Sequence, residues 1–292
     1  MRISSCYRTG KVVFSVEIYP PKKETGSIDR IYVTAERLSA LKPDFISVTY
    51  GAGANLADNS TCEIASNIKS RFGIETAAHL TCVNSTREEV SIMLSRLKDA
   101  GIENVMALRG DINPAVPPKN VFRHANELAI AIQRQCDFCI LGACYPEGHY
   151  ESRSLEADIE NLKYKIGAGV EVLISQLFLD NSVFYRFMDK IRAAGIAVPV
   201  SAGIMPIVRE TQINKTIALS GTSLPHDFTA LVGRFENDPD SLYKAGVDYA
   251  AAQINDLIDH GVDGVHMYCM NRSATAAEIY EKTFGARPEA RG

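Results

Sequence analysis

Residues 76–110, TAAHLTCVNSTREEVSIMLSRLKDAGIENVMALRG, contain the pattern that decides the fold. Two short apolar runs, Thr76–Cys82 and Asn104–Gly110, flank a longer amphipathic stretch over Arg87–Ala100. Short apolar runs of this kind are typical of buried strands, and the stretch between them has the spacing of a helix. The segment therefore predicts one strand–helix–strand unit.

The same alternation continues along the whole chain. Helical stretches include Leu155–Ala168, Asn181–Ala194 and Ser241–His260, and the six further strand-like runs are Val12–Ile18, Phe45–Tyr50, Phe138–Tyr145, Val172–Phe178, Val198–Met205 and Gly264–Met270. Eight such units predict an α/β fold, a closed (β/α)8 TIM barrel, which takes about 250 residues and so makes residues 1–292 a single domain. An open doubly wound sheet is the second possibility, and the absence of G-x-G-x-x-G disfavours it.

Helix boundaries have matching signals. Ser85 with Glu88 predicts a full capping box, Ser154 predicts a second N-cap, and Gly101, Gly195 and Gly261 stand where three helices are expected to end.

Composition excludes several classes of function. The chain has 31 Lys and Arg against 35 Asp and Glu, so it lacks the positive excess that a nucleic-acid partner needs. It also has no apolar run of membrane-spanning length and no signal peptide, which predicts a cytoplasmic protein. The seven cysteines are odd in number and mostly lie in apolar strands, so no disulfide is expected, and Cys136-x-x-Cys139 lacks the second pair that a metal site requires.

Polar residues recur on one face of the predicted strands, towards their carboxyl ends. Alternation along a strand places Ser15 and Glu17 on one face, for example, and Ala107, Arg109 and Asp111 on another. Active sites of parallel barrels are built at these ends. Seven residues are therefore expected at one mouth of the barrel: Glu17, Thr49, His79, Arg109, Asp111, Tyr145 and Gln176. The other histidines, His124, His226, His260 and His266, are interpreted as surface or packing residues.

With these residues in place, the chain closely resembles the methylenetetrahydrofolate reductases from Val13 to about Phe284. The matching stretches are Phe14–Pro21 (FSVEIYPP), Leu41–Gly51 (LKPDFISVTYG), His79–Cys82 (HLTC), Ala107–Asp111 (ALRGD), Tyr145–His149 (YPEGH), Asp158–Lys165, Ser175–Asp180 (SQLFLD) and Tyr268–Arg272 (YCMNR).

The resemblance implies a noncovalent FAD that takes a hydride from NADH or NADPH and passes it to 5,10-methylenetetrahydrofolate in a ping-pong cycle. Arg109 and Lys165 suit the diphosphate of the cofactor, because it needs charge-assisted donors. The flavin contacts carry over to Tyr50, Ala52, His79, Arg109, Gly110, Asp111, Ala125, Tyr145, His149, Ser152, Asp158, Asn161 and Lys165. FAD and FMN are not distinguished by the residues alone.

The folate contacts carry over to Glu17, Asp111, Gln176, Gln212 and Arg272, with Thr49 and Gln176 near the nicotinamide. The resemblance implies that Glu17 is the general acid, which protonates the departing ring nitrogen of the substrate. Burial in an apolar barrel favours the protonated form of a carboxyl group, as this role requires. Asp111 is expected to stay ionised, to bind the pterin and to stabilise the cation that develops.

Some positions depart from the family pattern. Thr216 stands where bacterial enzymes commonly have a stacking Phe, and His124 replaces a Tyr beside the flavin-contacting Ala125. The chain ends soon after the barrel, so the regulatory domain of the eukaryotic enzymes and inhibition by S-adenosylmethionine are not expected. We expect a homo-oligomer.

Two points stay open at the level of sequence. The electron donor is either NAD(P)H or a reduced protein, and a flavin-binding barrel that serves as a subunit of a redox complex is a further alternative. A Schiff-base or metal-dependent aldolase would need a Lys at a strand tip or a carboxylate–histidine cluster, and the predicted inward faces show neither.

Overall fold

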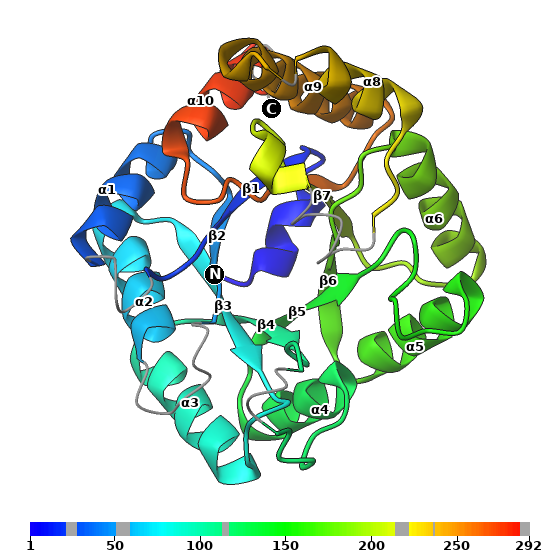
Figure 1. The fold of residues 1–292 in the computed structure, drawn as a ribbon. Coiled ribbons are helices and arrows are strands. Elements are labelled where there is room, and N and C mark those ends of the chain that lie inside the picture. The colour runs from blue at the N-terminus through cyan, green and yellow to red at the C-terminus, as the bar shows by residue number, and fades with distance from the viewer. Residues whose placement is uncertain (22–27, 51–58, 113–116, 214–221, 236, 287–292) are drawn as a thin grey trace.

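Eight parallel strands close into a barrel in the order of the sequence, as predicted (Figure 1). The computed structural model describes residues 1–21, 28–50, 59–112, 117–213, 222–235 and 237–286. The strands are β1 (Val13–Ile18), β2 (Phe45–Val48), β3 (Glu75–Thr81), β4 (Asn104–Leu108), β5 (Cys139–Cys144), β6 (Val170–Ser175), β7 (Val200–Ile204) and β8 (Gly264–Met267).

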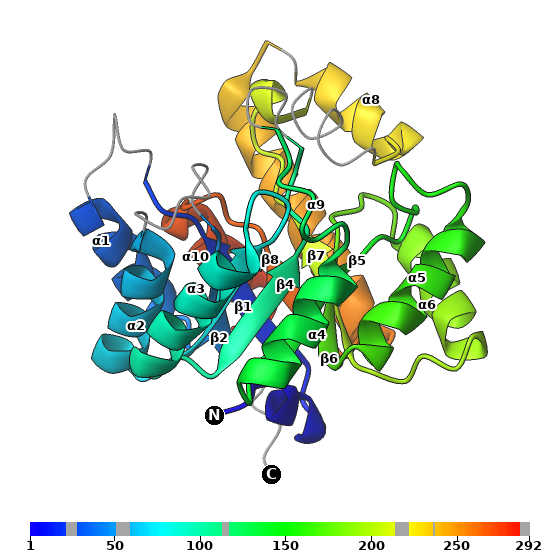
Figure 2. The same cartoon turned by 90° about the horizontal axis from the view of Figure 1, so that it is seen from below.

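Helices surround the barrel, and all of those named next except α8 cover its outer wall with their apolar faces. They are α1 (Ile28–Ser39), α2 (Ser60–Phe72), α3 (Arg87–Asp99), α4 (Ala125–Gln135), α5 (Leu155–Gly167), α6 (Asn181–Ala193), α8 (His226–Arg234), α9 (Pro239–Asp259) and α10 (Ser273–Lys282). Figure 2 shows α8 at the end of the barrel opposite the N-terminus. None of the helices in the described ranges is long and apolar enough to cross a membrane.

The two faces of the strands belong to two different apolar clusters. Phe14, Val16 and Ile18 belong to the large cluster beneath the helices, whereas Val13 belongs to a smaller cluster inside the barrel. The interior cluster also contains Phe45, Ala77, Leu141 and Ile174. The predicted alternation is therefore confirmed for β1, β2, β3, β5 and β6.

The alternation predicted for β4 is wrong. Ala107 packs into the outer cluster, and Met106 and Leu108 face the barrel interior. The strand ends at Leu108. Arg109 and Asp111 therefore lie in the loop beyond it, where strand alternation no longer determines where a side chain points.

The capping box of α3 lies one residue later than predicted. Thr86 accepts a hydrogen bond from the backbone N–H of Glu89, and the Glu89 carboxylate accepts one from Thr86 N. The predicted cap at Ser154 is confirmed, because its hydroxyl accepts from Ala157 N at 3.2 Å. Gly101, Gly195 and Gly261 have positive φ angles just after α3, α6 and α9, as helix ends of this type require.

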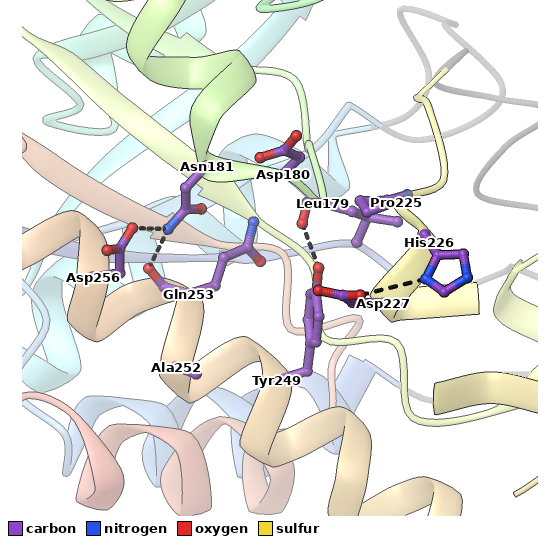
Figure 3. A pocket seen from close by; sticks show the side chains of 10 residues that line it. All are labelled: Leu179, Asp180, Asn181, Pro225, His226, Asp227, Tyr249, Ala252, Gln253 and Asp256. Atoms are coloured by element: carbon purple, nitrogen blue, oxygen red, sulfur yellow. Dashed lines mark hydrogen bonds and ion pairs between the residues drawn. The ribbon is translucent and has the colours of Figure 1, made fainter. Parts of the chain in front are cut away.

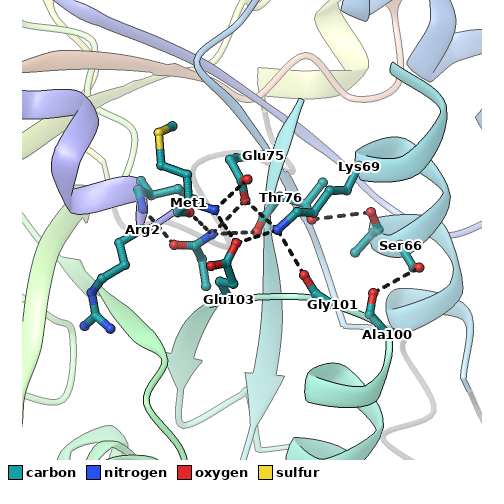
Figure 4. Close-up of polar contacts among 12 residues, drawn as sticks. Met1, Arg2, Ser66, Lys69, Glu75, Thr76, Ala100, Gly101 and Glu103 are labelled. Atoms are coloured by element: carbon teal, nitrogen blue, oxygen red, sulfur yellow. Dashed lines mark hydrogen bonds and ion pairs between the residues drawn. The ribbon is translucent and has the colours of Figure 1, made fainter. Parts of the chain in front are cut away.

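The amino-terminal end of the barrel is closed by a 3-10 helix, η1 (Ile3–Arg8). Figure 4 shows Met1, just before this helix, with its amino group bonded to Glu75 on β3. Asn104 at the start of β4 ties the helix to the wall. Its Oδ1 accepts from Ile3 N at 2.7 Å, and its Nδ2 donates to Thr76 O at 3.3 Å. Ile3 and Cys6 then pack into the interior cluster. The closed end leaves the opposite mouth as the place for a site.

Asn104→Leu should destabilise the protein by about 1–3 kcal/mol, because Leu has similar volume but leaves the buried Ile3 N–H without its acceptor. Urea unfolding of the variant and the wild type measures this difference. Asn67→Leu is the control, because the Asn67 side chain on α2 donates an exposed hydrogen bond to Glu63 O. This change should alter the free energy of unfolding by no more than about 0.5 kcal/mol. Equal stability of the Asn104 variant and the wild type would contradict this account of η1.

Candidate active site

Glu17 lies near the carboxyl end of β1 with two imidazole rings beside its carboxyl group. Its Oε2 is 3.6 Å from Nε2 of His79 on β3 and 4.0 Å from Nε2 of His266 on β8. The Glu17 side chain is 18% exposed, whereas those of His79 and His266 are buried. The inward placement of Glu17 and His79 agrees with the sequence prediction. The predicted inward faces show no carboxylate–histidine group, and the grouping of Glu17 with His79 and His266 corrects that expectation.

His266 was interpreted from sequence as a surface or packing residue, and its position at the barrel interior was missed. Its Nδ1 lies 2.8 Å from Ser15 Oγ and its Nε2 3.2 Å from Ser47 Oγ. The parity of β8 would have placed it inward, because Val265 and Met267 on either side face the helices. His226 and His260 are exposed, as expected.

His79 has an unusual environment for a polar side chain. Among the described residues its Nε2 is buried without a hydrogen-bond partner. Burial lowers the pKa of this imidazole, an effect that Glu17 opposes and His266 reinforces. A buried group of this kind normally has a partner, so His79 fits a site whose ligand supplies one.

The lowered pKa of His79 predicts acid sensitivity. The folded protein keeps the ring neutral, whereas the unfolded chain binds a proton below about pH 6.5. The unfolded state then holds more protons, so stability should fall as the pH drops below about 6.5, by at most about 1.4 kcal/mol per pH unit. Urea unfolding between pH 7.5 and 5.5 should show a smaller loss for His79→Gln than for the wild type. Identical slopes would contradict this environment for His79.

Tyr145, His149 and Lys165 gather after β5 and on α5. The rings of Tyr145 and His149 meet edge to face at 4.7 Å, and Lys165 Nζ lies 5.7 Å from the Tyr145 ring centre. Lys165 Nζ also donates to Ala143 O at 2.8 Å. Burial lowers the pKa of Lys165, and the neighbouring Asp158 opposes that shift. A mostly buried ammonium beside an aromatic ring suits an anionic ligand that carries a planar ring.

Asp158 holds the loop that carries His149. It is buried on α5 and accepts hydrogen bonds from His149 N at 3.1 Å and Ser152 Oγ at 3.0 Å. Asp158, His149 and Ser152, all predicted to contact the flavin, are thus connected by hydrogen bonds. Asn161 lies on the same helix and is exposed.

Arg109 lies beyond the end of β4 and pairs with Glu151, which is not among the predicted site residues. Its two terminal nitrogens reach both Glu151 oxygens, one of them at 2.9 Å. The Arg109 partner holds the pKa of Glu151 at about 2, and the pKa of Arg109 is raised in turn. Gly110 follows with φ of +87°, and a Cβ there would lie 3.0 Å from that of Thr81.

Asp111 is exposed, and it is the second predicted catalytic residue. It lies near Tyr145, whose pKa is raised to about 12 by burial first and then by the negative charges of Asp158 and Asp111. The described contacts connect Asp111 with the Tyr145 group rather than with Glu17.

The predicted folate residues lie on loops after four strands. Gln176 follows β6 and accepts from Leu177 N at 2.9 Å, and Gln212 follows β7 and accepts from Val208 N at 3.0 Å. Arg272 follows β8, where burial and the nearby Arg209 lower its pKa. Thr49 follows β2, and its backbone N–H donates to Ile18 O at 3.0 Å.

The remaining predicted residues do not belong to the groups described above. Tyr50 packs against the outer cluster and Ala125 begins α4 after His124, while Ala52 and Thr216 lie outside the described residues. Among the described residues no group of three His, Cys, Asp or Glu is arranged to hold a metal, and all seven cysteines are free.

A cavity of about 430 Å³ lies apart from this group, between the start of α6, the start of α8 and the inner part of α9 (Figure 3). Asp180, Asp227 and Asp256 line it together with Tyr249 and Gln253. None of the predicted site residues borders it. Its carboxylates and open rim make it unlike the mouth of the barrel, where basic and aromatic groups meet.

Comparisons with known proteins agree with the geometry. Residues 2–284 match the family model of methylenetetrahydrofolate reductase. The chain is 34% identical to 5,10-methylenetetrahydrofolate reductases of Pectobacterium carotovorum and Escherichia coli, over 96% of this chain and 92% and 93% of those proteins. It is 31% identical to a relative from Arabidopsis thaliana named methylenetetrahydrofolate reductase (NADH) 1, over 95% of this chain and 49% of that protein.

Two solved structures share the fold. One is an uncharacterized protein from Clostridium thermocellum described as binding two copies of 5-methyl-5,6,7,8-tetrahydrofolic acid, with a TM-score of 0.70 at 15% identity over 96% of this chain and 98% of that one. The other is a dihydropteroate synthase from Coxiella burnetii, with a TM-score of 0.56 at 10% identity over 94% of this chain and 93% of that one. The family match over nearly the whole chain and the identity to curated reductases lead to one conclusion: this chain belongs to the methylenetetrahydrofolate reductase family of oxidoreductases.

Proposed function

We propose that this chain reduces 5,10-methylenetetrahydrofolate to 5-methyltetrahydrofolate with a bound flavin, in a ping-pong cycle fed by NADH or NADPH. The family supports the folate reduction itself. The observation that carries the finer proposal is the Glu17 carboxyl group, which lies 3.6 Å from a buried His79 Nε2 that has no partner among the described residues. A carboxyl group and a ring nitrogen that a ligand could bond thus lie together at this end of the barrel.

The residues after β4 and β5 fit a flavin dinucleotide. Lys165 and Arg109 bring positive charge, the Tyr145 ring offers an aromatic edge, and His79 offers the free ring nitrogen. A phosphate group needs charge-assisted donors and an isoalloxazine ring needs a flat apolar contact, so this set of residues fits a flavin, and the family resemblance favours FAD. When bound, the flavin supplies the hydride that the one-carbon unit accepts.

Glu17 would supply the proton. Opening the five-membered ring of the substrate leaves a nitrogen that must be protonated as its bond to the one-carbon unit breaks, and Glu17 is the carboxyl group at the centre of the mouth. Its partly exposed side chain allows both contact with substrate and later recovery of a proton from water. Asp111, on its exposed loop, would hold the pterin and stabilise the positive charge of the opened ring. Gln176, Gln212 and Arg272 surround the same mouth and would complete the folate site.

The bound flavin gives the first test. Purified protein should be yellow, and heat denaturation should release FAD, identified by mass, in about equal amount to the protein. Release of FMN would agree with a flavin enzyme but would contradict an FAD site. A colourless protein that no flavin reconstitutes would exclude the proposed function.

The electron donor has its own test, because Thr216 replaces the stacking aromatic of related enzymes. Loss of an aromatic contact costs about 0.5–1.5 kcal/mol in addition to lost burial, so NADH should bind about tenfold more weakly than with Phe there. A relative named for NADH supports NADH as donor. Stopped-flow reduction with NADH, NADPH or reduced ferredoxin separates the cases, and bleaching by the protein donor alone would contradict direct use of a nicotinamide.

We also propose that residues 1–292 act as one catalytic barrel in the cytoplasm and associate as a homo-oligomer. Light scattering of the purified protein tests the association, and a monomer at micromolar concentration would contradict it.

A further inference from the structure

The chain turns sharply between β8 and α10, just before a residue predicted to bind folate. Arg272 N donates a hydrogen bond to Cys269 O at 2.9 Å, which closes the turn. The two residues between them, Met270 and Asn271, both have positive φ angles, of 52° and 56°. Asn tolerates this conformation, whereas a long side chain such as Met rarely adopts it. Contacts around the turn must therefore hold it in this shape.

The Asn271 side chain makes two of these contacts, both with the backbone of Tyr19, which follows β1. Its Oδ1 accepts from Tyr19 N at 3.1 Å, and its Nδ2 donates to Tyr19 O at 2.9 Å. Main-chain pairing of β1 with β8 ends at Val16 and Met267, so the carboxamide continues the bonding beyond that pair. A carboxamide can do this because it has both an acceptor and a donor. We call these two bonds the Asn271 clamp.

Two weaker contacts attach the same turn to the end of β1. The Tyr19 hydroxyl donates to Met270 O at 3.3 Å, and the Cys269 thiol donates to Glu17 O at 3.2 Å. The turn is thus bonded to the backbone on both sides of Ile18, at the strand end that carries the proposed general acid. The clamp therefore determines where Arg272 lies relative to Glu17.

Arg272 has a partly buried guanidinium group that no carboxylate pairs with in the described part of the chain. Burial, and then the nearby charge of Arg209, lower the pKa of Arg272, so two positive groups approach each other here. A guanidinium group binds a carboxylate through two parallel hydrogen bonds. The arrangement favours an anionic group of a ligand, and the glutamate part of a folate carries carboxylates.

We propose that Asn271 is a positioning residue for the folate site: the Asn271 clamp holds the turn after β8 so that Arg272 can bind a carboxylate of the folate. This inference rests on the proposed function and adds a residue that lies outside the predicted folate contacts. Asn271 touches neither folate nor flavin in this account and acts through Arg272.

Asn271→Gly is the variant that tests the clamp. Glycine adopts a positive φ readily, so the turn can still form, but both bonds to Tyr19 are lost. Asn120→Gly is the matched control. Asn120 also has a positive φ, of 55°, and its exposed side chain forms no hydrogen bond with the described residues.

The expected readout is the dissociation constant of 5-methyltetrahydrofolate, measured by calorimetry on the oxidised flavoprotein. Asn271→Gly should weaken binding about tenfold, and Arg272→Met should weaken it at least as much. Adding Asn271→Gly to Arg272→Met should change the constant by less than about twofold, because the clamp acts only through Arg272. FAD affinity should be unchanged in every variant, and Asn120→Gly should bind folate as the wild type does.

Three outcomes would overturn the proposal: wild-type folate affinity in Asn271→Gly, wild-type affinity in Arg272→Met, or a tenfold loss from Asn271→Gly that persists beside Arg272→Met. The last would show that Asn271 stabilises the barrel end without positioning Arg272. A wild-type protein that binds no folate would instead contradict the proposed function, and this inference with it.

Hydrogen exchange at the Tyr19 amide tests the clamp without a variant that has to fold. Coupling between two events is reciprocal, so a clamp that raises folate affinity about tenfold is itself stabilised by folate to the same degree. Saturating 5-methyltetrahydrofolate should therefore slow exchange of this amide about tenfold. The Ile3 amide is the control, because it also donates to an Asn side chain, at the opposite end of the barrel, and should keep its rate. Exchange at Tyr19 that folate leaves unchanged would overturn the role of Asn271.

Discussion

Glu17→Gln should slow the folate half-reaction by about a hundredfold to ten-thousandfold while flavin reduction continues at nearly the wild-type rate. The substitution keeps the size of the side chain but removes the proton that the departing nitrogen requires, and general acid catalysis contributes factors of this size. Anaerobic stopped-flow measurement of each half-reaction alone separates the two effects.

Glu17→Asp is the matched variant, since it keeps a carboxyl group and shortens its reach. It should retain more of the folate half-reaction than the Gln variant. Equal loss in both half-reactions for Glu17→Gln would instead assign Glu17 a structural role beside His79 and His266.

Lys165→Met should weaken flavin binding by about tenfold to a hundredfold. Lys165 is mostly buried, lies against the Tyr145 ring and is the ammonium nearest to it in the described contacts. A hydrogen bond to a charged group contributes about 1.5–3 kcal/mol, and Met fills similar space without the charge. Titration of the flavin-depleted protein with FAD, followed by fluorescence, measures the dissociation constant.

Lys163→Met is the control for this change. Lys163 lies two residues earlier on α5 and forms an exposed pair with Glu160 at 2.7 Å. Its replacement should leave flavin affinity unchanged. If both variants bind FAD as tightly as the wild type, the diphosphate is held elsewhere.

The sequence was sufficient for the barrel and for much of the mouth. Regular strands such as β1 and β3 keep their alternation to their ends, so Glu17 and His79 could be placed inward from pattern alone. β4 stops at Leu108, and no sequence signal marks that stop one residue before Arg109. The predicted alternation therefore failed for Ala107, which faces the helices, and strand parity does not determine where Arg109 and Asp111 point.

Two further differences have physical reasons. Ser85 and Thr86 are each followed by a Glu three residues later, but the Ser85 hydroxyl donates to Thr81 O at 3.2 Å, and Thr86 forms the capping box with Glu89. The parity of β8 indicates an inward His266, but its hydrogen-bond partners are distant in sequence: Ser15 is 251 positions away and Ser47 is 219. The sequence pattern of one strand predicts which face a residue lies on. The hydrogen bonds between strands of a closed barrel become known only from the structure.

The proposed function requires this barrel to transfer electrons from a bound flavin to a folate one-carbon unit. The direct measurement is to reduce the bound flavin chemically without oxygen, add excess 5,10-methylenetetrahydrofolate, and follow both the flavin spectrum and the folate product. We expect the yellow colour to return and 5-methyltetrahydrofolate to form in an amount equal to the flavin oxidised. A flavin that stays reduced in the presence of excess substrate would contradict it.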